Sequence, residues 1–336
     1  ESEWIEFVED FKPDLIATTI VEDAYTYAHR LLGLAKSVHD VPVVVGGSMP
    51  TVVPRVMIEN PYIDYLVEGE GEVAFKELID ALMKDGDVSK VANLWYQENG
   101  VTKNTGLVKY LDMDEIPFQK LDFWDDKHFT KPYDGELRVT GFFEGSRGCM
   151  HKCHYCINRA FQVFQEEAGK VRRNKSPRRI VDEVKAIHKE RNFNLIMFTD
   201  DNFLGRQPRE LDEFFKLWKE EIDLPYWINT CIETVNDHNL PLLKASGCVG
   251  IAIGLETGSD WVRRNLLLKG KMDNKFYMEK FALMAKYKIR STANNMLGIP
   301  GEYEEDFFET IKLNKKIREL DPELTSFDVS FMAPYM

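Results

Sequence analysis

The sequence predicts an α/β protein in which a doubly wound parallel sheet precedes a barrel, or an incomplete barrel, of six β/α units. Apolar runs of strand length alternate with longer segments of helical periodicity along nearly the whole chain, a pattern typical of parallel sheets covered by helices. The alternation is interrupted once, between residues 105 and 137. The 336 residues also suffice for two hydrophobic cores, because domains usually contain about 100–200 residues.

The first part of the chain, residues 1–104, contains the elements expected of the doubly wound sheet. Strands are expected at 14–20, 41–47 and 63–69, and helices at 23–38 and 71–86. A hairpin is expected at 93–104, where Asn99-Gly100 supplies the positive φ of a two-residue turn. The chain begins with Glu inside a helical pattern and stops just after a strand-like run. We therefore expect the first domain to lack its opening and the second its end.

Residues 105–137 carry scattered aromatic residues, acids and prolines without a sustained period, and we interpret them as an interdomain linker. The second part, residues 138–336, resumes the alternation. Strands are expected at 138–144, 194–200, 226–232, 249–255, 291–298 and 324–332, and helices at 177–191, 208–221, 237–246, 273–287 and 304–319. Ser176 is expected to cap the first of these helices, ahead of Pro177. In barrels, the working face lies at the carboxyl ends of the strands.

Composition and charge exclude several classes of function. The formal net charge of −13 argues against a nucleic-acid partner, which requires a basic surface. No apolar run approaches the ~18 residues that cross a bilayer, and no secretory signal is visible, so we expect a soluble cytoplasmic protein without a membrane partner. Five cysteines in a chain of this length do not form a disulfide framework.

Three of the cysteines lie in the stretch "EGSRGCMHKCHYCINRAFQ". Cys149, Cys153 and Cys156 have the spacing C-x3-C-x2-C, and thiolates select zinc, copper(I) or iron–sulfur clusters. A structural zinc site has four ligands, and His151 or His154 would be available to complete one; a chance grouping also stays open. A cubane cluster usually takes four cysteines, so three leave one iron with an open position. The location after the first barrel strand favours a catalytic metal.

The other two cysteines, Cys231 and Cys248, fall in apolar strand patterns. We interpret both as buried small hydrophobic residues. Trp227, Asn229, Thr230 and Glu233 lie on or beside the third barrel strand, and any of them could face a substrate. The sequence does not rank these four residues.

The cysteine motif, with Tyr155 just before the third cysteine, resembles the signature of the radical SAM superfamily. "SRGCMHKCHYC" is especially similar to the branch with an N-terminal cobalamin-binding domain, and the resemblance covers nearly the whole chain. It implies that the three cysteines hold a [4Fe–4S] cluster. It also implies that S-adenosylmethionine (SAM) binds the fourth iron through its amino and carboxylate groups. The implied partners are a small-molecule substrate and an external one-electron reductant of the flavodoxin or ferredoxin type.

Segments at other predicted strand ends agree with this resemblance. "IMFTDDNF" carries Asp200 and Asp201, one of which the resemblance assigns to the SAM amino group, although helix capping is the alternative. "GLETGS" resembles a family segment that contacts the cosubstrate, which implicates Glu256 and Ser259. A lone Glu after a strand is more often a surface residue.

Three further SAM contacts are implied by the resemblance. In "NNMLGIPGE", the backbone from Leu297 to Ile299 is expected to flank adenine, and the Pro-Gly turn is compatible with this role. Tyr155 is expected to contact adenine through its backbone. Arg173 lies in the basic segment 170–179 and is a candidate for the SAM carboxylate, although a solvated charged surface is the commoner explanation for such a segment.

The N-terminal segments "KPDLIATTIVEDAY", "VPVVVGGSMPT" and "IDYLVEGEGE" resemble the second half of a cobalamin-binding Rossmann-like domain. Ligands bind such sheets at the carboxyl ends of the strands; ordinary strand-to-helix turns are the alternative. The candidate cobalamin contacts are Thr18, Thr19, Gly46, Gly47, Glu68 and Gly69. No Asp-x-His-x-x-Gly motif occurs in the chain. An axial histidine therefore lies upstream, or cobalamin binds without one, or the domain binds none.

The resemblance implies reductive cleavage of SAM to methionine and a 5′-deoxyadenosyl radical that abstracts hydrogen from an unactivated carbon. Cobalamin-dependent methyl transfer is the expected outcome. Radical cyclisation, rearrangement or sulfur insertion are the alternatives within radical enzymes. Outside that class, the motif would also fit an iron–sulfur electron-transfer protein or a zinc-bound interaction module. The sequence does not specify the substrate.

Overall fold

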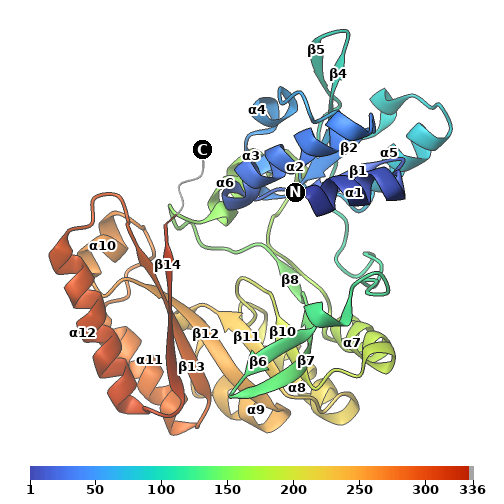
Figure 1. Cartoon of the computed structure of the whole chain (residues 1–336). Coiled ribbons are helices and arrows are strands. Elements are labelled where there is room, and N and C mark those ends of the chain that lie inside the picture. The colour runs from blue at the N-terminus through green and yellow to red at the C-terminus, as the bar shows by residue number, and fades with distance from the viewer. Residues whose placement is uncertain (333–336) are drawn as a thin grey trace. The chain divides into compact units, whose positions relative to one another are not determined.

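The computed structural model describes residues 1–332, which fold as two compact units (Figure 1). The first unit comprises residues 1–110 and 155–171, and the second comprises residues 111–154 and 172–332. The chain therefore returns to the first unit at Tyr155, between the second motif cysteine, Cys153, and the third, Cys156. Sequence order alone does not separate the two units.

The first unit contains a five-stranded sheet in the order β1-β2-β3-β4-β5. Strands β1 to β3 are parallel, whereas β4 and β5 form the predicted antiparallel hairpin at one edge. The strands are β1 (Ile16–Thr19), β2 (Val43–Gly46), β3 (Tyr65–Val67), β4 (Leu94–Glu98) and β5 (Val101–Asn104). The helices are α1 (Ser2–Phe11), α2 (Tyr25–Val38), α3 (Ser48–Val52), α4 (Pro54–Ile58), α5 (Ala74–Met83) and α6 (Ile157–Phe164).

Helices cover both faces of this sheet. Val43 and Val45 of β2 belong to one hydrophobic cluster, with residues of α1, α2, α3 and α4. Val44, on the opposite face of the same strand, belongs to a second cluster with residues of α5. Since side chains alternate between the two faces of a strand, one apolar run fills both cores. The predicted doubly wound sheet is confirmed.

The second unit contains a seven-stranded sheet in the order β14-β13-β12-β11-β10-β7-β6. Six neighbouring strands, β7 and β10 to β14, are parallel, and β6 is antiparallel at the edge. The strands are β6 (Thr130–Tyr133), β7 (Glu136–Phe143), β10 (Leu195–Phe198), β11 (Tyr226–Thr230), β12 (Cys248–Glu256), β13 (Arg290–Leu297) and β14 (Thr325–Phe331). The short strands β8 (Ser146–Arg147) and β9 (Arg173–Asn174) pair separately.

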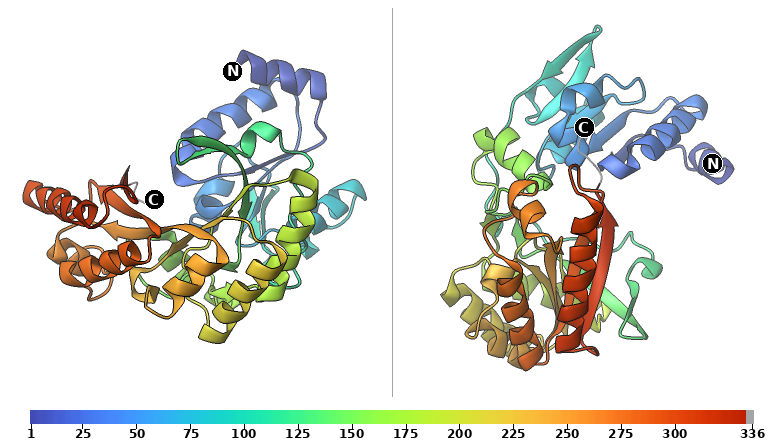
Figure 2. Two further views of the ribbon diagram at one scale, coloured as in Figure 1. Left: turned by 90° about the horizontal axis from the view of Figure 1, so that it is seen from below. Right: turned by 90° about the vertical axis from the view of Figure 1, so that its left-hand side faces the viewer.

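The helices of the second unit line one face of the curled sheet (Figures 1 and 2). They are α7 (Pro177–Arg191), α8 (Pro208–Glu221), α9 (Asn239–Ser246), α10 (Asp260–Asn265), α11 (Asn274–Lys286) and α12 (Glu304–Leu320). The core between strands and helices includes Phe198, Phe214, Trp218 and Tyr226, with ring centroids 5.1–6.0 Å apart. The predicted partial (β/α)6 barrel is confirmed. None of the helices within residues 1–332 is both long and apolar enough to cross a membrane.

Two differences from the predicted elements concern the linker and the segment after the cysteine motif. Residues 130–133, predicted as part of the linker 105–137, form β6 and pair with β7. Pro132 lies in this strand, and proline is tolerated there because an edge strand leaves one row of N–H groups unpaired. The second difference is the position of α6, which follows the cysteine motif in sequence and packs against α3 of the first unit.

Candidate functional site

The cysteine motif follows β7, the first parallel strand of the half-barrel. Cys149 is buried, and Cys153 and Cys156 are half-buried. Gly148, directly before the first cysteine, has a φ of +74°, a conformation that glycine adopts without steric cost. The carboxyl ends of all six parallel strands lie at one edge of the sheet, where barrel enzymes carry their active sites.

A buried carboxylate fixes the backbone before Cys149. Asp200 is 1% exposed, and it accepts hydrogen bonds from the Gly145 N–H at 2.8 Å and from the Ser146 hydroxyl. It also forms an ion pair with Arg206 at 3.3 Å. Burial lowers the pKa of Arg206, and the Asp200 carboxylate opposes that shift. Asp200 is therefore a structural anchor for the start of the motif.

Arg172 holds the same turn from the other side. Its guanidinium donates to Ser146 Oγ at 2.7 Å and to the Gly148 carbonyl at 3.1 Å. It also donates to the carbonyls of Asn202 and Gly205, at 3.0 and 3.3 Å. Arg172 thus ties the turn before Cys149 to the loop after β10. The sequence analysis did not single out this residue.

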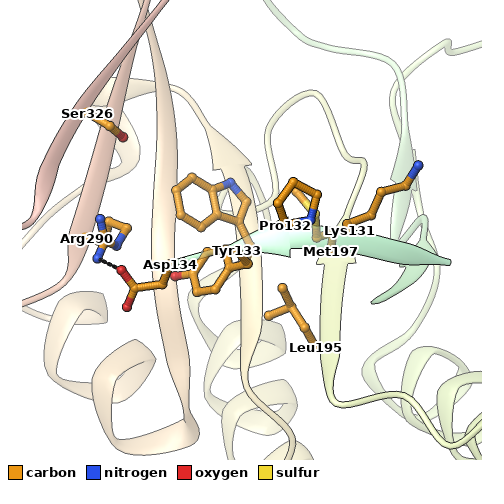
Figure 3. Close-up of a pocket in the computed structure, with 9 residues that line it drawn as sticks. Lys131, Pro132, Tyr133, Asp134, Leu195, Met197, Arg290 and Ser326 are labelled. Carbon is orange, nitrogen blue, oxygen red and sulfur yellow. Dashed lines mark hydrogen bonds and ion pairs between the residues drawn. The ribbon is translucent and has the colours of Figure 1, made fainter. Parts of the chain in front are cut away.

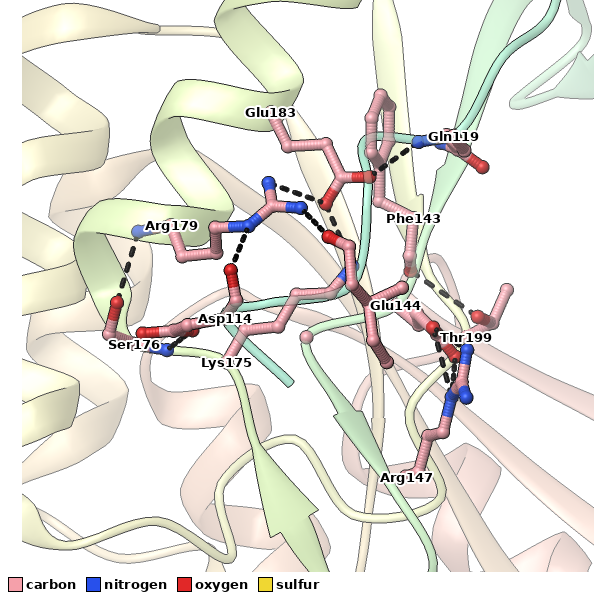
Figure 4. Close-up of polar contacts among 12 residues, drawn as sticks. Asp114, Gln119, Phe143, Glu144, Arg147, Lys175, Ser176, Arg179, Glu183 and Thr199 are labelled. Carbon is pink, nitrogen blue, oxygen red and sulfur yellow. Dashed lines mark hydrogen bonds and ion pairs between the residues drawn. The ribbon is translucent and has the colours of Figure 1, made fainter. Parts of the chain in front are cut away.

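A second buried ion pair lies beside this turn (Figure 4). Lys175 Nζ is 2.7 Å from Glu183 Oε2, and both side chains are almost fully buried. Glu183 also accepts a hydrogen bond from the Gln119 N–H at 3.0 Å, and the Lys175 N–H donates to the Gly145 carbonyl at 2.8 Å. These contacts join helix α7, the segment around Gln119 and the turn before the motif into one rigid support.

A fourth cysteine reaches the motif from β11. Cys231 directly follows this strand, and the ligand atoms of Cys149, His151 and Cys231 all lie within 4.8 Å of one another. A hydrogen bond with Cys231 lowers the pKa of Cys149 to about 6, although burial opposes the shift. The same contact, together with burial, raises the pKa of Cys231. Cys149 is therefore the thiolate of the pair, and the thiolate is the form that binds metals.

The interpretation of Cys231 as a buried strand residue is wrong, because the strand ends at Thr230 and the thiol faces the motif. The position of Cys231, directly after a strand at the carboxyl edge of the sheet, was the sequence signal that could have indicated its proximity to the motif. Cys248 is buried at the start of β12, as expected.

The third motif cysteine begins a helix. Cys156 is the N-cap of α6, and its sulfur accepts a hydrogen bond from Asn158 Nδ2 at 3.7 Å. The Cys149 sulfur accepts a hydrogen bond from the His151 N–H at 3.5 Å. Donors directed at sulfur favour the thiolate, so two of the three predicted ligands have local support for metal binding.

The structure distinguishes the two adjacent aspartates. Asp200 is enclosed by the contacts described above, whereas Asp201 is exposed beyond the carboxyl end of β10. A ligand at this edge would therefore reach the Asp201 carboxylate more readily. We retain Asp201 as the candidate for an ammonium group.

The two SAM candidates of the segment "GLETGS" occupy different environments. Glu256 is the last residue of β12, has a φ of +66° and forms an ion pair with Lys269 at 2.8 Å. Ser259 is 1% exposed, and its Oγ accepts a hydrogen bond from the Val262 N–H, so it caps α10. Glu256 stays a candidate ligand contact at the edge, whereas the Ser259 hydroxyl serves the helix. Lys269 was not identified from the sequence.

The end of β13 presents the predicted turn. Leu297 is the last strand residue, and Gly298 follows with a φ of +77°. Ile299 is buried, and its N–H donates to Glu302 Oε2 at 3.3 Å. Burial raises the pKa of Glu302, and within residues 1–332 its other oxygen, Oε1, is buried without a hydrogen-bond partner. Glu302 Oε1 can therefore accept a hydrogen bond from a ligand.

The remaining SAM candidates have local roles. Arg173 lies in β9 and donates to the Leu111 carbonyl at 2.8 Å, so it holds the chain that precedes the half-barrel. Tyr155 is half-buried at the start of the segment that returns to the first unit. For both residues, a SAM contact stays a prediction.

The cobalamin candidates gather at the carboxyl edge of the first sheet. Thr19 and Gly46 pair in register at the ends of β1 and β2, beside Thr18, and Gly47 follows with a φ of +104°. A Cβ at Gly47 would lie 2.6 Å from Thr19 Cγ2, so only glycine fits this turn without displacement. Of these four residues, Thr19 is exposed, and Thr18, Gly46 and Gly47 are half-buried.

The other two candidates lie after β3. Glu68 is buried and accepts hydrogen bonds from Trp95 Nε1 at 2.6 Å and Gln165 Nε2 at 3.0 Å. Burial raises the pKa of Glu68. The Gly69 N–H donates to Thr51 Oγ1 at 3.0 Å. Glu68 therefore links β3 to Trp95 of β4 and to the end of α6, and its carboxylate already has partners inside the unit.

A pocket of about 270 Å³ opens at the opposite, amino end of the half-barrel strands (Figure 3). The turn between β6 and β7 borders it: Tyr133 packs edge-on against Trp227 at 5.9 Å, and Asp134 pairs with Arg290 at 2.5 Å. Trp227, one of the four residues that the sequence suggested could face a substrate, lines this pocket, whereas none of the predicted cluster, SAM or cobalamin contacts does. Because barrel active sites lie at the carboxyl ends of strands, it is separate from the candidate site.

Comparison with sequence families gives two matches. The model of the radical SAM superfamily matches residues 143–313, and the model of the B12 binding domain matches residues 2–79. The first covers the half-barrel from the end of β7 to α12, and the second covers the parallel strands of the first unit. Both matches agree with the resemblance found in the motifs.

Individual proteins extend the likeness along the chain. A protein of Pyrococcus horikoshii described as an uncharacterized methyltransferase is 29% identical over 99% of this chain and 70% of its own length. The anaerobic magnesium-protoporphyrin IX monomethyl ester cyclase of Rubrivivax gelatinosus is 24% identical over 96% of this chain and 57% of its own length. The chain thus spans only part of each relative.

A solved structure shares the fold. The radical S-adenosylmethionine methyltransferase TsrM from Kitasatospora setae, solved with cobalamin and a [4Fe–4S] cluster, superposes with a TM-score of 0.73. The alignment covers 97% of this chain and 64% of that chain, at 16% identity. At this identity, the likeness establishes the common architecture.

The residues present fit the cofactors of such proteins. Three cysteines at C-x3-C-x2-C offer soft ligands for an iron–sulfur cluster, and donors to the sulfurs of Cys149 and Cys156 support their thiolate forms. Gly47 permits a tight turn at the carboxyl end of β2, which is the edge where such sheets bind ligands. The family matches confirm the predicted cofactors, which are a [4Fe–4S] cluster, SAM and cobalamin. This chain belongs to the radical SAM superfamily, in the branch with an N-terminal B12-binding domain.

Proposed function

We propose that the chain is the catalytic part of a cobalamin-dependent radical SAM methyltransferase that acts on an unactivated carbon of a small molecule. The observation that carries this proposal is the three-cysteine loop at the carboxyl edge of the half-barrel, in a chain that also has a B12-binding domain. The similarity to the Pyrococcus horikoshii protein, described as a methyltransferase, supports methyl transfer.

The residues of the chain bind and orient the reactants. Cys149, Cys153 and Cys156 are the proposed cluster ligands, and the three ligands leave one iron for SAM. In this proposal, Asp201 accepts a hydrogen bond from the SAM amino group, and Glu256 accepts hydrogen bonds from the ribose hydroxyls. When bound, the cluster and cobalamin supply the one-electron reduction of SAM and a methyl carrier.

The backbone at the end of β13 is the proposed adenine contact. The turn from Leu297 to Ile299 offers peptide groups at the strand edge, and Glu302 adds a buried acceptor there. We propose that Asp200, Arg172 and Glu183 hold the start of the cysteine loop and do not bind the reactants. Radical SAM chemistry requires an electron donor, and we propose a flavodoxin- or ferredoxin-type protein in that role.

A second candidate function is radical cyclisation without methyl transfer. The Rubrivivax gelatinosus relative, a cyclase by name, aligns over almost the whole of this chain. Methyl transfer and cyclisation would share the cysteine loop, the cofactors and SAM cleavage. They differ in whether a methyl group appears in the product.

The cluster assignment is tested in anaerobically reconstituted protein with iron, sulfide and cobalt quantified together. Cys153→Ala is expected to lose the [4Fe–4S] absorbance and the dithionite-driven cleavage of SAM to 5′-deoxyadenosine and methionine. Cys248→Ala, which alters a buried thiol at the start of β12, is the matched control and should retain both. SAM cleavage at the unaltered rate in Cys153→Ala would refute the proposal.

The reaction class is tested with SAM labelled in its methyl group. Incubation with reductant, cobalamin and an extract of small metabolites should give a labelled small-molecule product. Transfer of the label supports the methyltransferase. SAM cleavage with a converted but unlabelled product would favour the cyclisation alternative.

A further inference from the structure

A second group of metal-binding side chains lies beside the cysteine motif. It consists of Cys149, His151 and Cys231, and it differs from the proposed ligands of the iron–sulfur cluster. The three come from two segments, the loop after β7 and the residue after β11, and their ligand atoms all lie within 4.8 Å of one another. Only Cys149 belongs to the C-x3-C-x2-C motif. Two thiols and an imidazole are a ligand set that favours zinc and related divalent ions.

The spacing suits a single ion. With metal–sulfur bonds of about 2.3 Å in a tetrahedral site, two ligand sulfurs lie roughly 3.8 Å apart. The separations in this cluster are all below 4.8 Å, so small side-chain rotations would bring the three atoms onto one ion. A tetrahedral ion would keep its fourth position for water or another ligand.

The surroundings hold these ligands in place. The Cys231 N–H donates to Asn202 Oδ1 at 3.2 Å, and its carbonyl accepts from Thr234 Oγ1 at 2.6 Å, so the backbone at Cys231 is fixed. His151 Nε2 lies 4.0 Å from Glu233 Oε1. This distance is longer than a hydrogen bond; a small rotation of Glu233 would let it accept from the ring N–H, the common arrangement that orients a metal-binding imidazole.

We propose that, in the absence of its iron–sulfur cluster, the chain binds one zinc-class divalent ion through Cys149, His151 and Cys231. Because Cys149 is shared, this ion and the cluster exclude each other. The mutual exclusion rests on the proposed cluster ligation, whereas the binding of the ion does not. The chain would therefore have a metal-bound state that blocks cluster assembly until the ion leaves.

The test is titration of the cluster-free chain with Co²⁺ as a spectroscopic substitute for zinc, anaerobically and with a non-thiol reductant. We expect one equivalent of Co²⁺ to bind, with tetrahedral d–d bands and sulfur-to-cobalt charge-transfer absorption. Added Zn²⁺ should displace it. Glu233→Gln should weaken binding roughly 10-fold or more if Glu233 orients His151.

Two variants should show opposite losses. Cys231→Ala is expected to lose the charge-transfer bands but still assemble a cluster on the motif cysteines. Cys153→Ala should keep Co²⁺ binding and lose the cluster. Cys248→Ala should keep both. Pre-incubation with Zn²⁺ should slow cluster assembly in the unaltered chain and not in Cys231→Ala.

His151→Ala provides an independent test, because His151 is not a proposed cluster ligand. Loss of Co²⁺ binding with cluster assembly retained supports the site even where Cys231→Ala fails to fold. Unchanged Co²⁺ binding in both Cys231→Ala and His151→Ala, or no Co²⁺ binding by the unaltered chain, overturns the proposal. A failure of cluster assembly in the unaltered chain, with Co²⁺ binding intact, would instead contradict the proposed function.

Discussion

Asp200 and Asp201 show how burial divides two identical side chains between structure and function. Asp200 is enclosed by a backbone N–H, a hydroxyl and a guanidinium, whereas Asp201 is exposed at the strand edge. The sequence placed both at a strand end but could not choose between them. The choice depends on tertiary contacts, since Gly145 and Ser146, which donate hydrogen bonds to Asp200, lie 55 and 54 positions away in the sequence.

Asp200→Ala is expected to lower the free energy of unfolding by about 3–5 kcal/mol, because it leaves the buried Arg206 without its counter-charge. Asp201→Ala should change it by about 0.5 kcal/mol or less, as for an exposed position. Denaturant unfolding of the two variants measures the difference. Equal stabilities would show that Asp200 does not anchor the turn.

Cys231→Ala should raise the pKa of Cys149. A thiol that donates to the Cys149 thiolate stabilises the charged form and lowers the pKa to about 6 from 9.0; removal of the donor therefore moves the pKa back upward. At pH 7, the cluster-free variant should carry less thiolate and react more slowly with iodoacetamide. The rate of Cys149 alkylation against pH, followed by peptide mass spectrometry, checks this. An unshifted midpoint would contradict the assigned hydrogen bond.

At the level of elements, local capping signals made helices the most predictable features. Helices α7 and α8 have the predicted bounds, since Ser176 caps α7 and a Gln207–Glu210 capping box begins α8. Strand β6 was missed because it is a short edge strand that contains Pro132. Helix α6 was missed although Ile157, Phe161 and Phe164 recur at helical spacing, since it is only eight residues long and directly follows the cysteine motif.

Strand ends were predicted less well, and this affected the site. The expected strand 226–232 ends at Thr230 in the structure. Because the strand is two residues shorter than predicted, Cys231 lies outside it, and its thiol lies near Cys149. Its proximity to the motif is a tertiary contact between segments about 80 residues apart, which no local pattern in the sequence reports.

Gly258 marks a close approach between the loop after β12 and helix α12. A Cβ at this position would lie 2.4 Å from the Glu309 carbonyl oxygen and 2.5 Å from Thr310 Cα. Both are backbone atoms of a helix, so the elements must separate to admit a methyl group. Gly258→Ala should destabilise the protein by roughly 1–3 kcal/mol, as overpacking does.

The control for that substitution is Gly71→Ala, where the nearest atom to an added Cβ is Val67 Cγ1 at 3.9 Å. It should change the free energy of unfolding by about 0.5 kcal/mol or less. Thermal and denaturant unfolding compare the two variants. If Gly258→Ala were as stable as its control, the packing of α12 against the loop would be looser than the structure shows.

At the scale of the whole molecule, the two-part architecture was predictable because each part has its own periodic pattern and its own core. The three motif cysteines were predictable because their spacing is local. The path of the chain was not, since residues 155–171, which include the third motif cysteine, Cys156, pack with the first unit, whereas Cys149 and Cys153 belong to the second. That assignment depends on contacts such as Gln165 with Glu68, which join residues 97 positions apart.

The separate cores give a final prediction about cobalamin. A ligand that binds only the folded first unit stabilises that unit by mass action, by about 2.7 kcal/mol at a free concentration of 100 times its Kd. Hydroxocobalamin should therefore slow hydrogen exchange in β1, β2 and β3 while β10 to β13 of the half-barrel exchange at an unchanged rate in the cluster-free chain. Exchange followed by mass spectrometry at several cobalamin concentrations measures both.

Gly47→Val provides the matched variant for this measurement. Because a Cβ at Gly47 meets Thr19 Cγ2 at 2.6 Å and the backbone has a φ of +104°, a branched side chain would disturb the turn that is proposed to face cobalamin. The variant should lose the protection that cobalamin confers. Gly100→Ala, in the hairpin turn at the far edge of the sheet, should keep it. Cobalamin would bind elsewhere than at the ends of β1 and β2 if it slowed hydrogen exchange equally in the two variants. The same conclusion would follow if it slowed exchange mainly in the half-barrel.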